Sequence, residues 1–407
     1  MKRVTVSSEQ NRAGRPGEQL DALVSGRPVT RAGFLAGAGA AGLAAFLAAC
    51  GSDAPKATPP GAGSAAAAGA PTSGPATVSY VKGGTLNVYS WPEYFAPANT
   101  KEWKAKTGAA LNIASYESND ELFAKLGTAA GRNYDVVIPT SSFVAAMAGK
   151  GMLQKLDQGK IPWQHIDRSL LGKVFDPSNE YSIPKDFGTS GVIYDPAAIG
   201  GKIVTWQDFM DAAAKPGVSG KVRYSDDAQG GLGPGLWTLG FNYDTKDLAQ
   251  WTKAADLVKS EIVPHVKQIG DTFNTDPITS GQLVLTTADS SVARRALLKN
   301  SKLAWALPKP HSELWVDNYA LTKGAADTDA AYSFIQFMLQ PSVQVKETST
   351  IGYAYVLPHL QSKLKNFSAG DVVFPTAAQF EYLQNSVIHP SIQGKIQDLW
   401  SQVKASA

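Results

Sequence analysis

The segment Gly84-Thr-Leu-Asn-Val-Tyr-Ser-Trp-Pro-Glu-Tyr94 opens the part of the chain that can fold and indicates its fold class. Apolar and polar residues alternate from Thr85 to Trp91, which is the pattern of a strand with one buried face. Residues 97–107 then predict a helix, because proline is favoured in a first helical turn and Gly108 follows as a terminator. A strand that leads directly into a helix is the unit from which α/β lobes are built.

The same alternation continues along the chain. Further strands are expected at 110–116, 134–139, 191–194, 221–225 and 315–322, and further helices at 121–130, 142–150, 206–214, 248–258 and 328–339. Short strands that alternate with helices predict an α/β fold with a mostly parallel sheet. Ligands of open α/β sheets bind at the carboxyl ends of strands, so we expect Trp91, Thr140 and Asp227 to lie near a site.

Cys50 is the only cysteine among 407 residues, and it closes the tetrapeptide Leu47-Ala-Ala-Cys50. An uncharged, weakly apolar stretch from Gly33 to Ala49 precedes it, after a polar segment with several arginines, and this arrangement predicts an export signal. The Leu-Ala-Ala-Cys-Gly sequence resembles the lipobox of bacterial lipoproteins, which implies cleavage before Cys50 and lipidation of that cysteine. Both the Sec and the twin-arginine routes stay open, because Ala32 stands where a second arginine belongs.

Residues 50–82 consist mainly of Ala, Gly, Pro, Ser and Thr, and such a segment predicts a disordered tether because it has little apolar area to bury. No later segment reaches the run of about 18 apolar residues that a membrane span needs. We therefore expect an exported lipoprotein at the outer face of the cytoplasmic membrane, on its periplasmic or extracellular side. The lipid alone would attach it to the membrane.

Charge and motifs exclude several classes of function. The net charge is +3, and no basic patch with interleaved aromatic residues appears, so no nucleic-acid partner is expected. The five histidines are scattered singly and no G-x-S-x-G occurs, so we expect neither an enzyme nor a metal site nor a cofactor. An exported enzyme and a structural lipoprotein stay open as alternatives, and turnover of candidate substrates would separate an enzyme from a binding protein.

Several motifs together resemble the spermidine/putrescine-binding proteins of bacterial ABC transporters, in the same order and spacing, over nearly everything from Gly84 to the C-terminus. The motifs are Tyr89-Ser-Trp-Pro-Glu-Tyr94, Tyr116-Glu-Ser-Asn119, Tyr134-Asp-Val-Val-Ile-Pro139, Gly151-Met-Leu-Gln-Lys-Leu-Asp157, Tyr181-Ser-Ile-Pro184, Trp315-Val-Asp317 and Ile351-Gly-Tyr353. The resemblance implies a two-lobed, periplasmic-binding-protein-like α/β fold, with a mostly parallel sheet in each lobe and a ligand cleft between the lobes.

The same resemblance implies a monomer that binds a polyamine, putrescine or a spermidine-like cation, and delivers it to the permease subunits of an ABC importer. The alternative is that the same fold binds a different small amine or a zwitterionic solute. The implied division of the chain is 1–49 export signal peptide, 50–82 tether, 83–192 plus 317–360 lobe 1, and 193–316 plus 361–407 lobe 2.

The resemblance also implies ligand-binding residues, carried over only where this sequence matches the family. Trp315 and Asp317 resemble a pair that wraps and neutralises one ammonium, which suits a ligand with charged amines on an apolar chain. The full implied set is Trp91, Tyr94, Thr140, Asp227, Trp315, Asp317, Tyr353 and Gln384. The tryptophans expected to pack in the cores of the lobes instead are Trp103, Trp163, Trp206, Trp251 and Trp400.

Three positions depart from the family. Gly230 stands where a second acidic residue is expected, Thr286 where a tryptophan is expected, and Ser142 where a tyrosine is expected. With only Asp227 left for a second amine, spermidine should gain little over putrescine. The run Gly230-Gly-Leu-Gly-Pro-Gly235 either exposes backbone N–H groups to an anionic group of the ligand or has no ligand role, and the sequence leaves both possibilities open.

Overall fold

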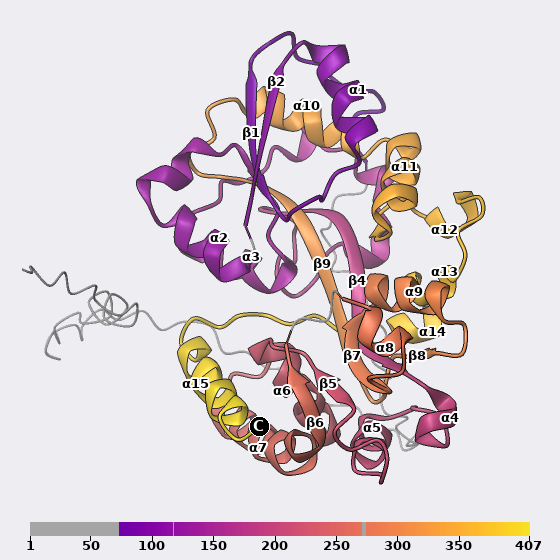
Figure 1. Ribbon diagram of the computed structural model, residues 1–407. Coiled ribbons are helices and arrows are strands. Elements are labelled where there is room, and N and C mark those ends of the chain that lie inside the picture. The colour runs from indigo at the N-terminus through magenta and orange to yellow at the C-terminus, as the bar shows by residue number, and fades with distance from the viewer. Residues whose placement is uncertain (1–72, 117, 271–273) are drawn as a thin grey trace, which may run out of the picture. The chain divides into compact units, whose positions relative to one another are not determined.

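Two long antiparallel strands, β4 (Ile183–Tyr194) and β9 (Ser312–Leu321), run through the middle of the folded chain (Figure 1). The computed structural model describes residues 73–116, 118–270 and 274–407. The predicted export signal, Cys50 and the first part of the predicted tether therefore lie outside the described residues. In the described ranges, no helix is both long and apolar enough to cross a membrane.

The strand order is β2-β1-β3-β9-β4-β7-β5-β6. On one side of the central pair, β1 (Thr85–Ser90) pairs in parallel with β2 (Ala110–Ser115) and β3 (Val136–Val137). On the other side, β5 (Val222–Tyr224) pairs in parallel with β6 (Val266–Ile269) and β7 (Leu285–Asp289). The two parallel sets confirm the predicted α/β class, and they are joined by antiparallel β4 and β9.

Three short strands attach to the central pair. β8 (Ala304–Ala306) and β10 (Ala354–Tyr355) pair with β4, and β11 (Leu383–Gln384) pairs with β9. The predicted strand at 134–139 shortens to β3, since Pro139 has no N–H group with which to continue the ladder. The strand predicted at 315–322 begins earlier, at Ser312.

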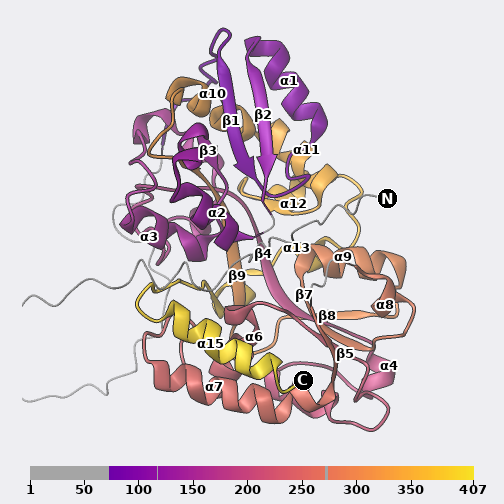
Figure 2. The same cartoon turned by 60° about the vertical axis from the view of Figure 1, so that its left-hand side comes forward.

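Helices flank both parallel sets. Beside β1 and β2 lie α1 (Pro97–Thr107), α2 (Asn119–Leu126), α3 (Ser141–Gly149), α10 (Thr328–Met338) and α11 (Pro341–Ile351) (Figures 1 and 2). Toward the other set lie α4 (Pro196–Ile199), α5 (Trp206–Ala213), α6 (Ala228–Thr238), α7 (Leu248–Glu261), α8 (Asp276–Thr279), α9 (Ser290–Lys299) and α15 (Gln393–Lys404). Three short helices follow β10: α12 (Leu360–Lys363), α13 (Gly370–Val373) and α14 (Ala377–Phe380).

Local signals explain the helix ends. Gly108 ends α1 in the left-handed conformation, with φ of 68°, as its predicted role as terminator requires. The helix predicted at 121–130 begins at Asn119, because the Ser118 side chain accepts the N–H of Glu121 and caps it. It stops at Leu126, and a short 3-10 turn over Ala129–Asn133 follows.

Two large apolar cores lie on opposite sides of the central strands. The first includes Trp103 and Trp163, and the second includes Trp206, Trp251 and Trp400. All five tryptophans predicted to pack in a core are therefore buried in one. Inside the predicted tether, Val78, Tyr80 and Val81 pack against the first core, since these three residues carry the apolar area that the rest of the tether lacks.

The glycine-rich run forms the first turns of α6, where glycine allows close helix packing. A Cβ atom at Gly231 would lie 2.5 Å from the Trp400 ring, and one at Gly235 would lie 2.6 Å from the Ala254 carbonyl oxygen in α7. The Asp227 side chain occupies the N-terminus of α6 and accepts the Gly230 N–H at 2.5 Å. A carboxylate of the protein itself thus takes the place that an anionic ligand group would need.

Candidate functional site

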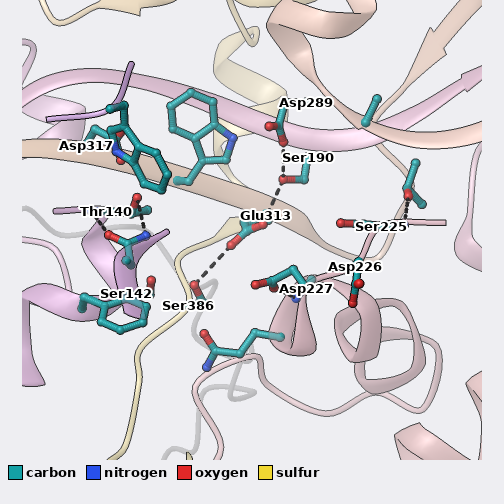
Figure 3. Close-up of a pocket in the computed structure, with 18 of the residues that line it drawn as sticks. Thr140, Ser142, Ser190, Ser225, Asp226, Asp227, Asp289, Glu313, Asp317 and Ser386 are labelled. Carbon is teal, nitrogen blue, oxygen red and sulfur yellow. Dashed lines mark hydrogen bonds between the residues drawn. The ribbon is translucent and has the colours of Figure 1, made fainter. Parts of the chain in front are cut away.

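A cavity of about 850 Å³ lies along β4 and β9 and receives side chains from both parallel sets (Figure 3). Among the described residues that line it are seven acidic side chains and one basic side chain, Arg295. The acidic ones are Glu93, Asp120, Asp226, Asp227, Asp289, Glu313 and Asp317. This excess of negative charge favours a cationic ligand.

One strand supplies the central row of the cavity. Side chains alternate between the faces of a strand, so Glu313, Trp315 and Asp317 of β9 point toward the same face, and all three line the cavity. The intervening Leu314 and Val316 point away and are buried in the first core. The row therefore has one carboxylate at each end and an indole between them.

Gly188 of β4 makes room for the Trp315 ring. The two residues are register partners, and a Cβ atom at Gly188 would lie 2.1 Å from Cζ2 of Trp315. The indole packs edge-to-face on Tyr353, with ring centroids 5.5 Å apart, and Tyr353 packs in the same manner on Tyr94 at 5.5 Å. These contacts fix the aromatic wall on this side of the cavity.

Trp91 lies at the end of β1, where the chain turns sharply. The centroid of its ring lies 4.7 Å from that of the Tyr116 ring. Two residues later, Glu93 has a φ of 52°, which is uncommon for a residue other than glycine. The indole N–H groups of both Trp91 and Trp315 are buried and have no hydrogen-bond partner among the described residues. At the cavity wall, these N–H groups can donate to a bound ligand or to water.

Asp317 is 5% exposed and sits beside a buried ion pair. The Tyr94 hydroxyl lies 2.5 Å from Oδ2 of Asp317 and 2.8 Å from Oδ1 of Asp186. A phenol has one proton to donate, so it cannot serve both carboxylates at once. Oδ1 of Asp317 accepts no hydrogen bond from the described residues. Burial and the neighbouring Asp186 charge raise the pKa of Asp317 to about 7.

Lys185 compensates Asp186 from behind the cavity. Its Nζ lies 2.5 Å from Oδ2 of Asp186 and donates to the Tyr355 hydroxyl at 2.8 Å, and both charged side chains are fully buried. The ammonium also lies 3.7 Å from the centroid of the Tyr94 ring. Lys185 is paired with Asp186, and of the two carboxylates only Asp317 lines the cavity.

Glu313 and Asp227 form the other end of the row, and Figure 3 shows the two side chains facing each other. Hydroxyl groups donate to Glu313 from Ser190 at 2.9 Å, Ser386 at 3.2 Å and Tyr243 at 3.4 Å. Burial and the charge of Asp227 raise the pKa of Glu313 to about 7. Asp227 is exposed on the cavity side, and its desolvation by neighbouring side chains together with the charges of Asp120 and Asp226 likewise raises its pKa.

Most of the predicted site residues come together. Seven of the eight line the cavity: Trp91, Tyr94, Thr140, Asp227, Trp315, Asp317 and Tyr353. Gln384 does not line it. It lies on β11, where its side-chain oxygen accepts the Trp237 indole N–H at 3.0 Å and the Tyr243 backbone N–H at 3.2 Å. Gln384 therefore holds Trp237, a cavity residue, rather than facing the cavity itself.

The three departures from the family fall in different places. Gly230 and Ser142 line the cavity, where a hydrogen atom and a hydroxymethyl group take up less room than the acidic and tyrosine side chains expected there. Thr286 does not line it, because it is buried on β7, where its hydroxyl accepts from the Arg223 side chain and donates to the Thr287 carbonyl. The neighbouring Thr287 lines the cavity instead.

One cavity residue, Glu313, escaped the sequence analysis. Glu313 was missed because the strand was predicted to begin at Trp315, which hid the alternation Glu313, Trp315, Asp317. Asp226 lines the cavity, but the Lys404 ammonium at 2.7 Å and the Trp400 indole at 2.9 Å bind it, so its part is structural. No group of three or more potential metal ligands occurs within the described chain.

Comparison with known proteins identifies the family. The model of a family described as bacterial extracellular solute-binding protein matches residues 98–370. A spermidine/putrescine-binding periplasmic protein of Escherichia coli (strain K12) is 31% identical over 274 residues, which cover 66% of this chain and 76% of that protein. The putrescine-binding periplasmic protein SpuD of Pseudomonas aeruginosa (strain UCBPP-PA14) is 28% identical over 346 residues, which cover 79% and 92%.

A solved structure agrees with this assignment. The spermidine/putrescine ABC transporter substrate-binding protein PotD from Streptococcus pneumoniae superposes with a TM-score of 0.69 at 26% identity, covering 79% of this chain and 99% of that one. Because it covers 79% of this chain, the similarity shows that the fold as well as the sequence is that of a transport receptor. The chain belongs to the bacterial extracellular solute-binding proteins.

Proposed function

We propose that this protein is the solute-binding component of an ABC importer, which binds a polyamine in the cavity along β9 and delivers it to the permease. The observation that carries the proposal is the lining itself, in which seven carboxylic side chains and one arginine surround a wall of aromatic rings. Similarity to polyamine-binding relatives adds support.

A polyamine has two chemical parts, and the cavity offers a surface for each. Carboxylates attract the ammonium groups, and each cation–π contact to a tryptophan contributes about 0.5–2 kcal/mol. A micromolar affinity requires about 8 kcal/mol, so aromatic rings alone cannot supply it and a charged partner is needed. We assign ligand contacts to Trp91, Tyr94, Thr140, Asp227, Trp315, Asp317 and Tyr353.

Delivery requires release, and we propose that two lobes open and close around the cavity. Lobe 1 would comprise residues 83–192 and 317–360, and lobe 2 residues 193–316 and 361–407. The chain would cross between them on β4, on β9 and again after about Pro358. The first core is formed mainly by residues of lobe 1 and the second mainly by residues of lobe 2, although Val373 and Val387 of lobe 2 also belong to the first core.

We further propose that the mature protein is a monomeric lipoprotein that begins at Cys50 and has no catalytic activity. Two acyl chains on one cysteine suffice for stable membrane attachment. A Cys50→Ser precursor should therefore leave the membrane fraction, whereas the unchanged chain should be released by detergent and not by salt. Membrane fractionation after high-salt washing distinguishes the two, and a Cys50→Ser chain that stays with the membranes would contradict the anchor.

The binding proposal is tested by a thermal-shift screen of the purified chain, followed by calorimetry. Putrescine, cadaverine, spermidine and agmatine should raise the melting temperature, because a ligand that binds only the folded state stabilises it. Amino acids form the second arm, because the sequence leaves open a zwitterionic solute as the ligand. A shift with amino acids and none with amines would replace the polyamine by a zwitterionic solute.

A further inference from the structure

The two carboxylates at the ends of the β9 row stand at a fixed separation. Glu313 and Asp317 are four residues apart on one strand, which places their Cα atoms about 13 Å apart at about 3.3 Å per residue. The pairing with β4 is continuous between them, from Ser190 opposite Glu313 to Asp186 opposite Asp317. Because two paired strands hold this spacing, it acts as a measure of ligand length.

Within the described chain, neither Glu313 nor Asp317 forms an ion pair with a lysine or arginine. Oδ1 of Asp317 is without a hydrogen-bond partner in the described chain, on a side chain that is 5% exposed. The hydrogen bonds to Glu313 come from three neutral hydroxyls, while Asp227 places a second negative charge beside it. Ionised carboxylates in such surroundings are unfavourable unless a cation joins them, so each end is suited to one ammonium group.

The surface between the ends is apolar. The Trp315 indole lies against Gly188 midway along the row, about 6.6 Å from either end at the strand spacing. A ligand that reaches both carboxylates must cross this ring with its hydrocarbon part. The arrangement of charge, aromatic ring and charge thus matches a linear chain with an ammonium at each end.

Chain length then decides which polyamine fits. An extended chain advances about 1.2 Å per bond, so the five bonds between the nitrogens of a four-carbon diamine span about 6 Å, and the nine bonds between the terminal nitrogens of a triamine such as spermidine span about 11 Å. We propose that Glu313 is a specificity-determining residue, which with Asp227 binds the far ammonium of a long polyamine whose near ammonium binds Asp317. A four-carbon diamine reaches one end only.

This inference rests on the proposed function and revises one expectation from the sequence. From the sequence, only Asp227 was expected to bind a second amine, because Gly230 replaces an acidic residue. Spermidine was therefore expected to bind little more tightly than putrescine. Glu313 restores the missing charge from a different element, β9 instead of α6. The preference should accordingly favour the longer amine.

Calorimetry on the purified full chain with linear diamines of four to twelve carbons tests the measure of length directly. All these probes carry two charges, so only their length varies. Affinity should rise at least tenfold between the four-carbon and the eight-carbon diamine, which has nine bonds between its nitrogens, and should fall again by twelve carbons. A steady gain with every added methylene, or equal affinities, would overturn the inference, because ordinary apolar burial would then explain the data.

The variant Glu313→Gln supplies the second arm. It keeps an acceptor for the three hydroxyls but removes the charge, so spermidine affinity should fall at least tenfold while putrescine affinity changes less than threefold. The matched control is Glu381→Gln, at an exposed position outside the cavity, and circular dichroism checks that the variants fold. If Glu313→Gln weakened the binding of both amines equally, or of neither, the role of Glu313 would be overturned, while the proposed function would stand. Absence of binding of any amine to the unchanged protein would overturn the proposed function as well.

Discussion

The two ends of the β9 row carry the same chemical group in different settings. At the Asp317 end, the carboxylate is buried, and a fully buried Lys185–Asp186 pair lies directly behind it. At the Glu313 end, hydroxyl groups and a second acid surround a half-buried carboxylate. Both pKa values rise to about 7, but Asp186 is the chief neighbouring charge in one case and Asp227 in the other.

This difference indicates that the two ends have different roles in binding. The Asp317 end is rigid, since a network of charged and aromatic side chains holds it, and such an end suits an anchor for one ammonium. The Glu313 end is held by neutral hydroxyl groups, so it suits a second ammonium, which only a sufficiently long ligand can place there. Changes at the first end should therefore affect stability and all ligands, and changes at the second should affect selectivity.

The largest effect is expected from Lys185→Met, which removes the only cation that contacts Asp186 within the described chain. An uncompensated buried carboxylate should lower the free energy of unfolding by about 3–5 kcal/mol, as measured by urea denaturation. Lys155→Met is the matched control, because its ion pair with Glu180 is exposed and should matter by less than about 1 kcal/mol. If the two variants had the same free energy of unfolding, the Lys185–Asp186 ion pair would not stabilise the Asp317 end.

The next effect concerns binding. Asp317→Asn should weaken polyamine binding by about 2–5 kcal/mol, because it leaves an ammonium without its counter-charge in an aromatic cleft. Calorimetry with spermidine and putrescine should show the same loss for both amines, in contrast to Glu313→Gln. Asp371→Asn, at an exposed position outside the cavity, is the control. If Asp317→Asn weakened the binding of spermidine only, Asp317 would be the end that sets selectivity and Glu313 the anchor.

A smaller effect is expected at the aromatic wall. Trp91→Ala should cost about 1–2 kcal/mol of binding through lost stacking and cation–π energy, and Trp91→Phe should recover part of that loss. Titration of both variants with spermidine makes the comparison. If the phenylalanine variant bound no better than the alanine variant, the ring face would not be the contributing contact.

The last effect is a pH dependence of stability in the ligand-free protein, which is small for a single pH step and accumulates over several pH units. The folded-state pKa values of Asp317 and Glu313 lie near 7, above the ordinary value near 4. The folded state therefore holds more protons than the unfolded state between about pH 4 and pH 7, and stability falls as pH rises through this window, by up to about 1.4 kcal/mol per pH unit for each group. Urea denaturation of Asp317→Asn should show a shallower decline, and an unchanged decline would contradict the raised pKa of Asp317.

Local patterns were sufficient to predict much of this molecule. The alternation at Thr85–Trp91 and the termination of α1 at Gly108 predicted β1 and α1, because strand alternation and a left-handed glycine are local properties. The position of Trp91 at a strand end predicted its place in the cavity. Such features depend on a few neighbouring residues, so one sequence contains them.

The buried Lys185–Asp186 pair could not be predicted in this way. Two adjacent charged residues argue against a buried strand, and β4 buries them only because Tyr94 and Tyr355, distant in sequence, supply hydrogen bonds. The strand was accordingly expected only from 191 to 194, whereas it begins at Ile183. Glu313 was missed for a related reason, because its role depends on Asp227, which α6 brings to the same end of the cavity.

One measurement tests the central claim that carboxylates of the cavity ionise as they bind a polyamine. Spermidine is titrated into the protein between pH 5.5 and pH 8 in buffers of different ionisation enthalpy, which counts the protons exchanged on binding. The amines stay charged throughout this range, while Asp317 and Glu313 titrate near pH 7. The account predicts that affinity rises with pH and that protons are released at pH 6.5. Affinity that does not depend on pH, with no proton released, would contradict it.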